Sequence, residues 1–144
     1  MGGLSRRKGA DGERAVVRLA TSLGIPARRV IRTADATHPD EGDVHLWDGR
    51  VVVQVKTGKT AQNASTTQIG TWWAETQAQS HRVPGADMAL LVTQRRGHGL
   101  ANPQMWCAHV TLDDLAAWLG GAERHRDVVT LRLAGLLRML KGAQ

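Results

Sequence analysis

Three polar residues near the middle of the chain have types and spacing that suit phosphate chemistry. Asp43 follows a glycine, Gln54 lies eleven residues further on, and Lys56 is two residues beyond it. The alternation of apolar and polar residues predicts a β-hairpin here, with Asp43 at the start of one strand. Gln54 and Lys56 then project from the same face of the second strand, so the three side chains can converge.

These residues offer the oxygen atoms that a hard divalent cation prefers. Carboxylate, amide and backbone carbonyl oxygens all bind Mg²⁺ or Mn²⁺, which makes Asp43, Gln54 and the carbonyl of Val55 candidate ligands. A cation held there polarises a scissile phosphate and lowers the pKa of an attacking water, while Lys56 orients that water or stabilises developing charge. Glu13, on the apolar face of the first expected helix, adds a second carboxylate.

The register of the hairpin follows from its valines. Residues 44–47 form the first strand, Asp48 and Gly49 the turn, and residues 51–56 the second strand. Val51, Val53 and Val55 share one face, and burying each is worth roughly 1.5 to 3 kcal/mol. We therefore expect the valine face to be buried and Gln54 and Lys56 to lie on the opposite, open face.

The remaining elements place the hairpin in an α/β domain. A flexible basic arm over residues 1–9 precedes a helix capped by Asp11, and the order is helix, three strands, helix, two strands and further helices. This order predicts one domain over residues 10–144, with a mixed central sheet flanked by helices. The further elements are a strand over 28–33, a helix capped by Ser65 and ended by Pro84 and Gly85, strands over 88–93 and 104–110, a helix over 111–118 and a leucine-rich C-terminal helix.

The charge of the chain favours a polyanionic partner. Nineteen Lys and Arg against thirteen Asp and Glu give a net charge of +6 and a pI near 10.7. Simple solubility is the alternative, but the basic residues are grouped along the chain, which favours nucleic acid. The candidate DNA-binding residues are Arg6, Arg7, Lys8, Arg14, Lys59, Arg95 and Arg96, with a further basic group at Arg28, Arg29 and Arg32.

Other functional classes find less support. We expect neither a membrane span nor a signal peptide, and the single Cys107 fits a reducing, intracellular compartment. Gly58-Lys59-Thr60 lacks the earlier glycine of a phosphate-binding loop, and the six histidines lack zinc-ligand spacing. His38 contacts a phosphate or, more simply, is a solvated loop residue.

Several further features each allow two interpretations. Trp72 and Trp73 could stack on bases, but their helical spacing favours the core, to which Trp106 and Trp118 are also assigned. The segment from Arg95 to Gly99 is either a DNA clamp or a solvated turn. The stripe of Leu133, Leu136, Leu137 and Leu140 covers the core or forms a dimer face, and the core is favoured.

Taken together, these motifs resemble the PD-(D/E)xK nuclease superfamily, and most closely the archaeal-type Holliday junction resolvases. Those enzymes have a basic arm, then Lys-Gly and a helix with a Glu-Arg pair, here Lys8-Gly9 and Glu13-Arg14. An Asp at the head of a strand follows, here Asp43. A Glu-x-Lys sequence comes one hairpin strand later, and Gln54-Val55-Lys56 stands in its place. The likeness covers residues 6–60, extends loosely to 93, and does not reach past 104.

The departure from the family pattern is Gln54, which removes one negative charge from the metal site. A Gln-x-Lys variant is familiar from Mrr-type restriction endonucleases, so the resemblance still implies a restriction-endonuclease-like fold and hydrolysis of DNA with Mg²⁺ or Mn²⁺. It also implies four-way junctions as the first substrate and a homodimer that makes paired cuts. The alternatives are a restriction-like or repair nuclease acting on duplex or branched DNA, and a catalytically silent DNA-binding module.

Overall fold

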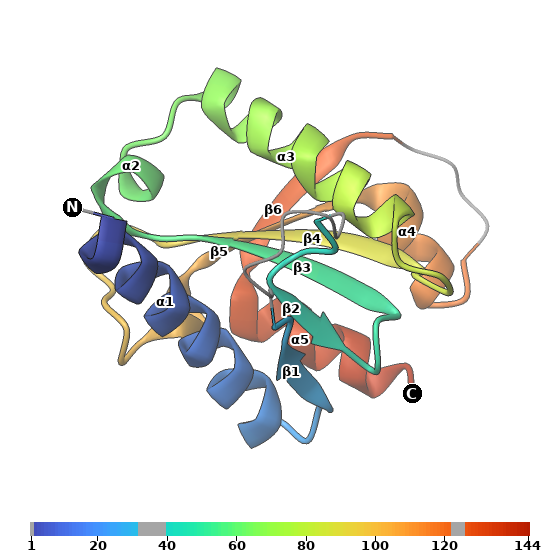
Figure 1. Cartoon of the computed structure of the whole chain (residues 1–144). Coiled ribbons are helices and arrows are strands. Elements are labelled where there is room, and N and C mark those ends of the chain that lie inside the picture. The colour runs from blue at the N-terminus through green and yellow to red at the C-terminus, as the bar shows by residue number, and fades with distance from the viewer. Residues whose placement is uncertain (1, 32–39, 122–125) are drawn as a thin grey trace.

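The computed structural model describes residues 2–31, 40–121 and 126–144, with side chains from Gly9 onward within these ranges. Six strands form one sheet in the order β1-β2-β3-β4-β5-β6, and helices cover it (Figure 1). In chain order the elements are α1 (Gly2–Ser22), β1 (Ala27–Arg29), β2 (Val44–Leu46), β3 (Val51–Lys56), α2 (Gly58–Gln62), α3 (Thr66–His81), β4 (Met88–Thr93), the 3-10 helix η1 (Pro103–Met105), β5 (Cys107–Thr111), α4 (Leu112–Trp118), β6 (Val128–Arg132) and α5 (Leu133–Gly142).

The sheet is mixed, as the sequence predicts. Strands β1, β2 and β3 pair antiparallel, β3 and β4 pair parallel, and β4, β5 and β6 again pair antiparallel. In the hairpin, Val44 lies opposite Val53 and Leu46 lies opposite Val51. The predicted hairpin and strand β4 are therefore confirmed, and α3 lies on the crossover between the two parallel strands.

Two helices cover the valine face of the sheet. Figure 1 shows α1 and α5 on one side of the sheet and α3 on the other. Val51, Val53 and Val55 belong to the main hydrophobic cluster, together with apolar side chains of α1 and α5. The C-terminal leucine stripe is fully buried in this cluster, which confirms the core interpretation: Leu133, Leu136, Leu137 and Leu140.

The opposite face is covered by α3. Ser65 caps this helix, because its side chain accepts a hydrogen bond from the backbone nitrogen of Gln68, as predicted. Trp72 and Trp73 pack with Leu91 of β4 in a second cluster, so the core interpretation of these two tryptophans is also confirmed. Both faces of β3 are consequently buried, which is expected for a strand next to a parallel crossover.

The prediction for the N-terminal arm is wrong in this structure. Helix α1 begins at Gly2, so Asp11 lies within the helix and does not cap it. Its carboxylate instead accepts a hydrogen bond of 3.1 Å from Nη1 of Arg14, one turn further along the helix surface. Residues 2–9 thus continue the helix that carries Glu13.

Two strand predictions also need correction, and a sixth strand was not predicted. Strand β1 covers Ala27–Arg29 and not 28–33, of which 32 and 33 lie outside the described residues. The fifth strand begins at Cys107 and not at Gln104, because Pro103–Met105 form the 3-10 helix η1. Strand β6 was not predicted; it is short, lies at the sheet edge and is half exposed. In the described part of the chain no helix is both long and apolar enough to cross a membrane.

Candidate active site

One pocket brings together all the predicted catalytic residues. It has a volume of about 670 Å³ and lies where the C-terminal half of β3 meets α1 and α3. Glu13, Asp43, Gln54, Val55 and Lys56 all contribute to its walls, so the predicted convergence is present. Among the described residues, the lining consists of Gly9, Ala10, Glu13, Arg29, Asp40, Asp43, Gln54, Val55, Lys56 and Glu75.

Asp43 is fixed to strand β3 by a buried hydrogen bond. Its Oδ2 accepts from the backbone nitrogen of Val55 at 2.8 Å, and its own nitrogen donates to the carbonyl of Val53 at 2.9 Å. Gly42 makes this approach possible: its φ is 92°, and a Cβ there would lie 2.7 Å from a methyl group of Val52. The Gly-Asp pair of the motif therefore has a steric reason.

Gln54 lies on the predicted face of β3, but this face is not open. Its side chain is 4 % exposed, because α3 packs over it. Gln54 Oε1 accepts a hydrogen bond of 2.6 Å from the hydroxyl of Thr76, and Gln54 Nε2 donates to Oε2 of Glu75 at 3.3 Å. The amide is thus held between two residues of α3 at the inner wall of the pocket.

Lys56 lies at the outer end of the same strand face and is partly exposed. Its Nζ is 3.9 Å from Oε2 of Glu75 and 5.5 Å from the ring centre of Trp72. The ammonium group is therefore held over the pocket by a carboxylate and an aromatic face. This position leaves the charge accessible to an anion that enters the pocket.

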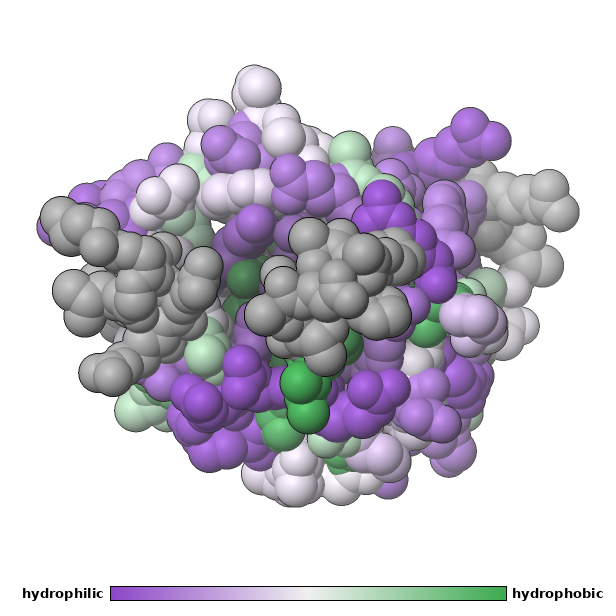
Figure 2. All heavy atoms as spheres, in the orientation of Figure 1, coloured by the Kyte–Doolittle hydropathy of each residue, from purple (hydrophilic) through white to green (hydrophobic). Residues whose placement is uncertain are grey.

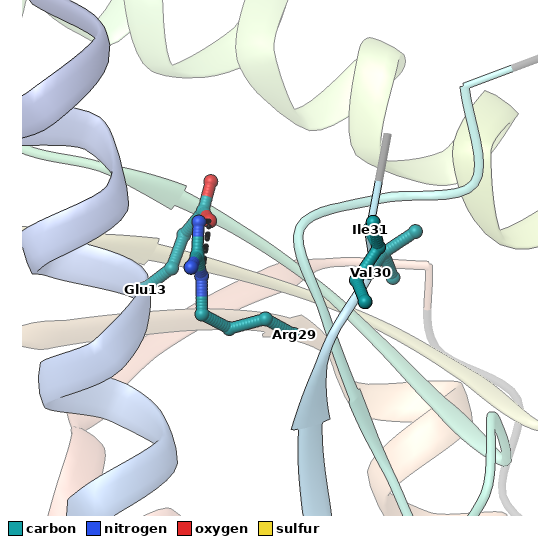
Figure 3. A pocket seen from close by; sticks show the side chains of 4 residues that line it. All are labelled: Glu13, Arg29, Val30 and Ile31. Carbon is teal, nitrogen blue, oxygen red and sulfur yellow. Dashed lines mark hydrogen bonds and ion pairs between the residues drawn. The ribbon is translucent and has the colours of Figure 1, made fainter. Parts of the chain in front are cut away.

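Glu13 reaches the pocket from α1 and is paired with Arg29 of β1. Nε and Nη2 of Arg29 each lie 2.9 Å from Oε2 of Glu13, and Figure 3 shows the two side chains pointing toward one another. The pair also lines a second pocket of about 260 Å³ with Val30 and Ile31. One oxygen of Glu13 is thus engaged by Arg29, a contact that the sequence did not predict.

Glu13 can reach the pocket because α1 approaches the end of β3 closely. A Cβ built on Gly12 would collide with the side-chain methyl of Thr57, the residue directly after β3. Glycine at this position lets the helix lie near the end of the strand. Glu13 and Lys56, each one residue away from this contact, therefore line the same pocket.

Sequence reasoning did not place three charged residues in the pocket: Arg29, Asp40 and Glu75. It named Arg29 only as part of a basic group. Asp40 accepts hydrogen bonds from the backbone of Gly42 and from Nε2 of Gln79, which ties the segment before β2 to α3. Glu75 lies three residues after Trp72, on the neighbouring row of the predicted helical stripe. That spacing indicates that Glu75 lies near Trp72 on the helix surface, but it does not show which face of the sheet the helix covers.

The chemistry of the lining suits a hard cation. Asp43 offers a carboxylate and Val55 a backbone carbonyl at this pocket. Gln54 offers an amide, whose oxygen here accepts from the buried Thr76 and whose nitrogen faces Glu75. Within the described residues, no three His, Cys, Asp or Glu side chains are grouped closely enough to form a metal site by themselves. Mg²⁺ does not require such a group, because it commonly binds one or two carboxylates and completes its shell with water and substrate phosphates.

Basic residues surround the pocket end of the sheet. Arg95 and Arg96 are exposed in the turn after β4, and Lys59 is exposed in α2, after β3. Gln94 links the two segments: its backbone nitrogen donates to the carbonyl of Lys56, and its side chain accepts from the nitrogen of Gly58. Hydrophilic side chains are spread over much of the face seen in Figure 2.

The other predicted DNA-binding residues lie on or near α1. Arg14 is exposed and pairs with Asp11. Arg6, Arg7 and Lys8 belong to the first turns of α1, but their side chains lie outside the described residues, as do Arg32 and His38. Comparison of the chain with protein-family models, with curated proteins and with solved structures found no match.

Proposed function

We propose that this protein is an intracellular, metal-dependent endodeoxyribonuclease of the PD-(D/E)xK type, with four-way DNA junctions as its first substrate and a homodimer as its working form. The observation that carries the proposal is the convergence of Asp43, Gln54, Val55, Lys56 and Glu13 in one pocket. These residues come from α1, from β3 and from the bend just before β2, and were singled out by sequence alone. Apart from the short α2 and η1, the observed order from α1 to β5 is the one predicted from the sequence.

The proposed cation is Mg²⁺ or Mn²⁺, held by Asp43, the carbonyl of Val55 and the amide oxygen of Gln54, with Glu13 as a further carboxylate. When bound, it would polarise the scissile phosphate and ease deprotonation of the attacking water. Asp43 is suited to the central role because Val55 fixes its carboxylate against the strand. Arg29 shares one oxygen of Glu13, which limits Glu13 to its remaining oxygen as a ligand.

Lys56 is proposed as the electrostatic catalyst. Its ammonium lies at the pocket and is held only loosely by Glu75, at 3.9 Å, so it can approach a phosphate oxygen. There it would stabilise the charge that develops as the phosphodiester bond breaks. Lys59, Arg95, Arg96 and the basic start of α1 would hold neighbouring phosphates, contacts that fix position without reading sequence.

A cleavage assay tests the proposal. Labelled four-way junction, duplex and single strand would each be incubated with Mg²⁺, with Mn²⁺ and with chelator, using wild-type protein and Asp43→Asn. We expect metal-dependent cutting of the junction that Asp43→Asn abolishes. Cutting of duplex alone would favour a restriction-like or repair nuclease. Binding without any cutting would favour the silent DNA-binding module, and the neutral Gln54 is the feature consistent with that outcome.

A further inference from the structure

The hydroxyl group of Thr76 has two short acceptors for one proton. Its Oγ1 lies 2.6 Å from Oε1 of Gln54 and 2.7 Å from the carbonyl oxygen of Trp72. A threonine hydroxyl donates a single hydrogen bond. Thr76 is fully buried. With the Gln54 amide in its present orientation, only one of these two oxygens can receive the proton.

The opposite orientation of the Gln54 amide satisfies both contacts. If the amide is turned end for end, Nε2 donates to Oγ1 of Thr76, and the hydroxyl proton goes to the carbonyl of Trp72. A hydroxyl can accept and donate at the same time, so this chain of hydrogen bonds is complete. The two ends of an amide have nearly the same size, and the turn therefore needs no extra space.

The turned amide places an oxygen against Glu75. In the present orientation Nε2 lies 3.3 Å from Oε2 of Glu75, so after the turn two oxygen atoms face one another at about that separation. Two such oxygens repel unless a cation lies between them. Neighbouring oxygen ligands of Mg²⁺, each about 2.0 to 2.1 Å from the ion, are about 3 Å apart, which is close to the separation available here.

We propose that Gln54 and Glu75 bind a divalent cation as a pair, and that the Gln54 amide turns over when the cation binds. Glu75 then supplies, from α3, the negative charge that Gln54 does not carry. Thr76 is the positioning residue, because its hydroxyl partners the amide in both orientations. This inference rests on the proposed function, since it requires a cation in the same pocket.

Binding of Mg²⁺ alone tests the role of Glu75. Calorimetric titration of the full chain with MgCl₂, without DNA, would compare wild type with Glu75→Gln. We expect Glu75→Gln to weaken Mg²⁺ binding roughly tenfold or more, since even indirect partners of metal ligands contribute that much. Asp48→Asn is the matched control: it removes the same charge at the exposed hairpin turn, outside the residues that line the pocket, and should leave the affinity unchanged.

Substitutions of Thr76 test the proposed rotation of the Gln54 amide. In the bound orientation the hydroxyl makes two hydrogen bonds, to Nε2 of Gln54 and to Trp72, whereas in the free orientation the proton serves one acceptor. Thr76→Val keeps the shape and loses one hydrogen bond more from the bound state. It should therefore weaken Mg²⁺ binding by roughly 2- to 10-fold. Thr76→Ser keeps the hydroxyl and should restore wild-type affinity.

Nuclear magnetic resonance gives a direct view of the amide. The side-chain NH₂ of Gln54, assigned by its loss in Gln54→Glu, faces the pocket in the free protein and the buried Thr76 in the bound one. Its exchange with solvent should slow on addition of Mg²⁺ in wild type and stay unchanged in Glu75→Gln. The diamagnetic ion leaves the resonance sharp enough to follow.

The outcomes separate this inference from the proposed function. Wild-type protein that cuts DNA with Mg²⁺ while Glu75→Gln binds the ion equally well would overturn the paired site and leave the nuclease standing. If solvent exchange of the Gln54 side-chain NH₂ in that active protein does not change on addition of Mg²⁺, the proposed rotation of the amide is wrong. A protein that neither binds Mg²⁺ nor cuts DNA would overturn both.

Discussion

The backbone nitrogen of Val55 donates a buried hydrogen bond of 2.8 Å to Oδ2 of Asp43. This contact ties the carboxylate to the strand that also carries Gln54 and Lys56. The distance from Asp43 to either side chain is therefore set by the hairpin itself and does not depend on a mobile loop. Changes at Asp43 should consequently affect both chemistry and stability, and the two effects can be separated.

Asp43→Asn and Asp43→Ala should both abolish DNA cleavage and leave DNA binding nearly intact. Asn keeps an oxygen that can accept from Val55, but Ala leaves that buried N–H without its acceptor, at a cost of about 1 to 3 kcal/mol in the free energy of unfolding. Urea unfolding would measure the difference, and gel shift the binding. Wild-type cleavage by either purified variant would refute the site assignment.

Lys56→Ala should reduce the cleavage rate by about 100- to 1000-fold, the usual effect of removing one group that stabilises transition-state charge. DNA binding should change little, because the pocket end of the sheet keeps its other basic residues. Lys141→Ala is the control, since Lys141 contacts the carbonyl of Gly24 at the far end of α1. Single-turnover rates would be compared. Equal losses in the two variants would point to a general charge effect and not to a catalytic lysine.

Gln54→Glu should keep or raise activity and give a tighter Mg²⁺ dependence, because it restores the commoner acidic ligand. Gln54→Ala should cut poorly. This defect should not come from an unsatisfied buried hydroxyl, because Thr76 can still donate to the carbonyl of Trp72 at 2.7 Å. Cleavage would be measured across a range of Mg²⁺ concentrations. If wild type and both variants are equally active, Gln54 has no part in the chemistry; if only Gln54→Glu cuts, the natural protein is a silent binder.

Changing Arg6, Arg7 and Lys8 together to Ala should weaken DNA binding and flatten its salt dependence. Three lost phosphate contacts should reduce the slope of log affinity against log salt by about 2 to 3 units. Binding would be measured by fluorescence anisotropy over a series of salt concentrations. The control removes the same charge from three exposed C-terminal residues: Arg132, Arg138 and Lys141. An unchanged slope in the first variant would show that the start of α1 does not contact DNA.

His109 should make the protein less stable as the pH falls. Burial lowers the pKa of His109 from its ordinary value of 6.5, and its ring nitrogens contact the hydroxyls of Thr93 and Thr130. Below pH 6.5 the unfolded chain therefore binds a proton that the folded chain does not, so the free energy of unfolding decreases until the pH reaches the folded pKa. His109→Gln should lose this part of the pH dependence. Urea unfolding at about pH 7.5 and about pH 5.5 would measure the free energy of unfolding of wild type and of His109→Gln. An equal change between the two pH values in both proteins would contradict the prediction.

The hairpin and its register were predictable because a period of two is a strong local signal. Val51, Val53 and Val55 had to be buried together, and this fixed the face on which Gln54 and Lys56 lie. The same local pattern could not show what covers the other face. Burial of Gln54 depends on α3, which lies further along the chain. Contacts between such distant residues produce no periodic pattern in the sequence.

Other parts of the site depended equally on distant contacts. The ion pair of Glu13 with Arg29 joins a helix to an edge strand. The type of either residue does not indicate which residue it pairs with. Strand β6 was missed for a different reason: it is half exposed, and its adjacent Val128 and Val129 interrupt the alternation of apolar and polar residues. The extension of α1 to Gly2 was missed because Asp11 is a good N-cap type, although here it serves as a surface partner of Arg14.

The parallel pairing of β3 with β4 also bears on the sequence distances that must be closed to form the pocket. Leu46 and Val51 are close in sequence, so the hairpin that carries Asp43, Gln54 and Lys56 closes only a short loop. Lys56 pairs with Thr93 across the whole α2 and α3 segment, which is a much longer closure. The hairpin half of the pocket therefore depends on contacts that are local in sequence. The part that contains Glu75 needs the longer closure, because α3, which covers Gln54, lies on the crossover between β3 and β4.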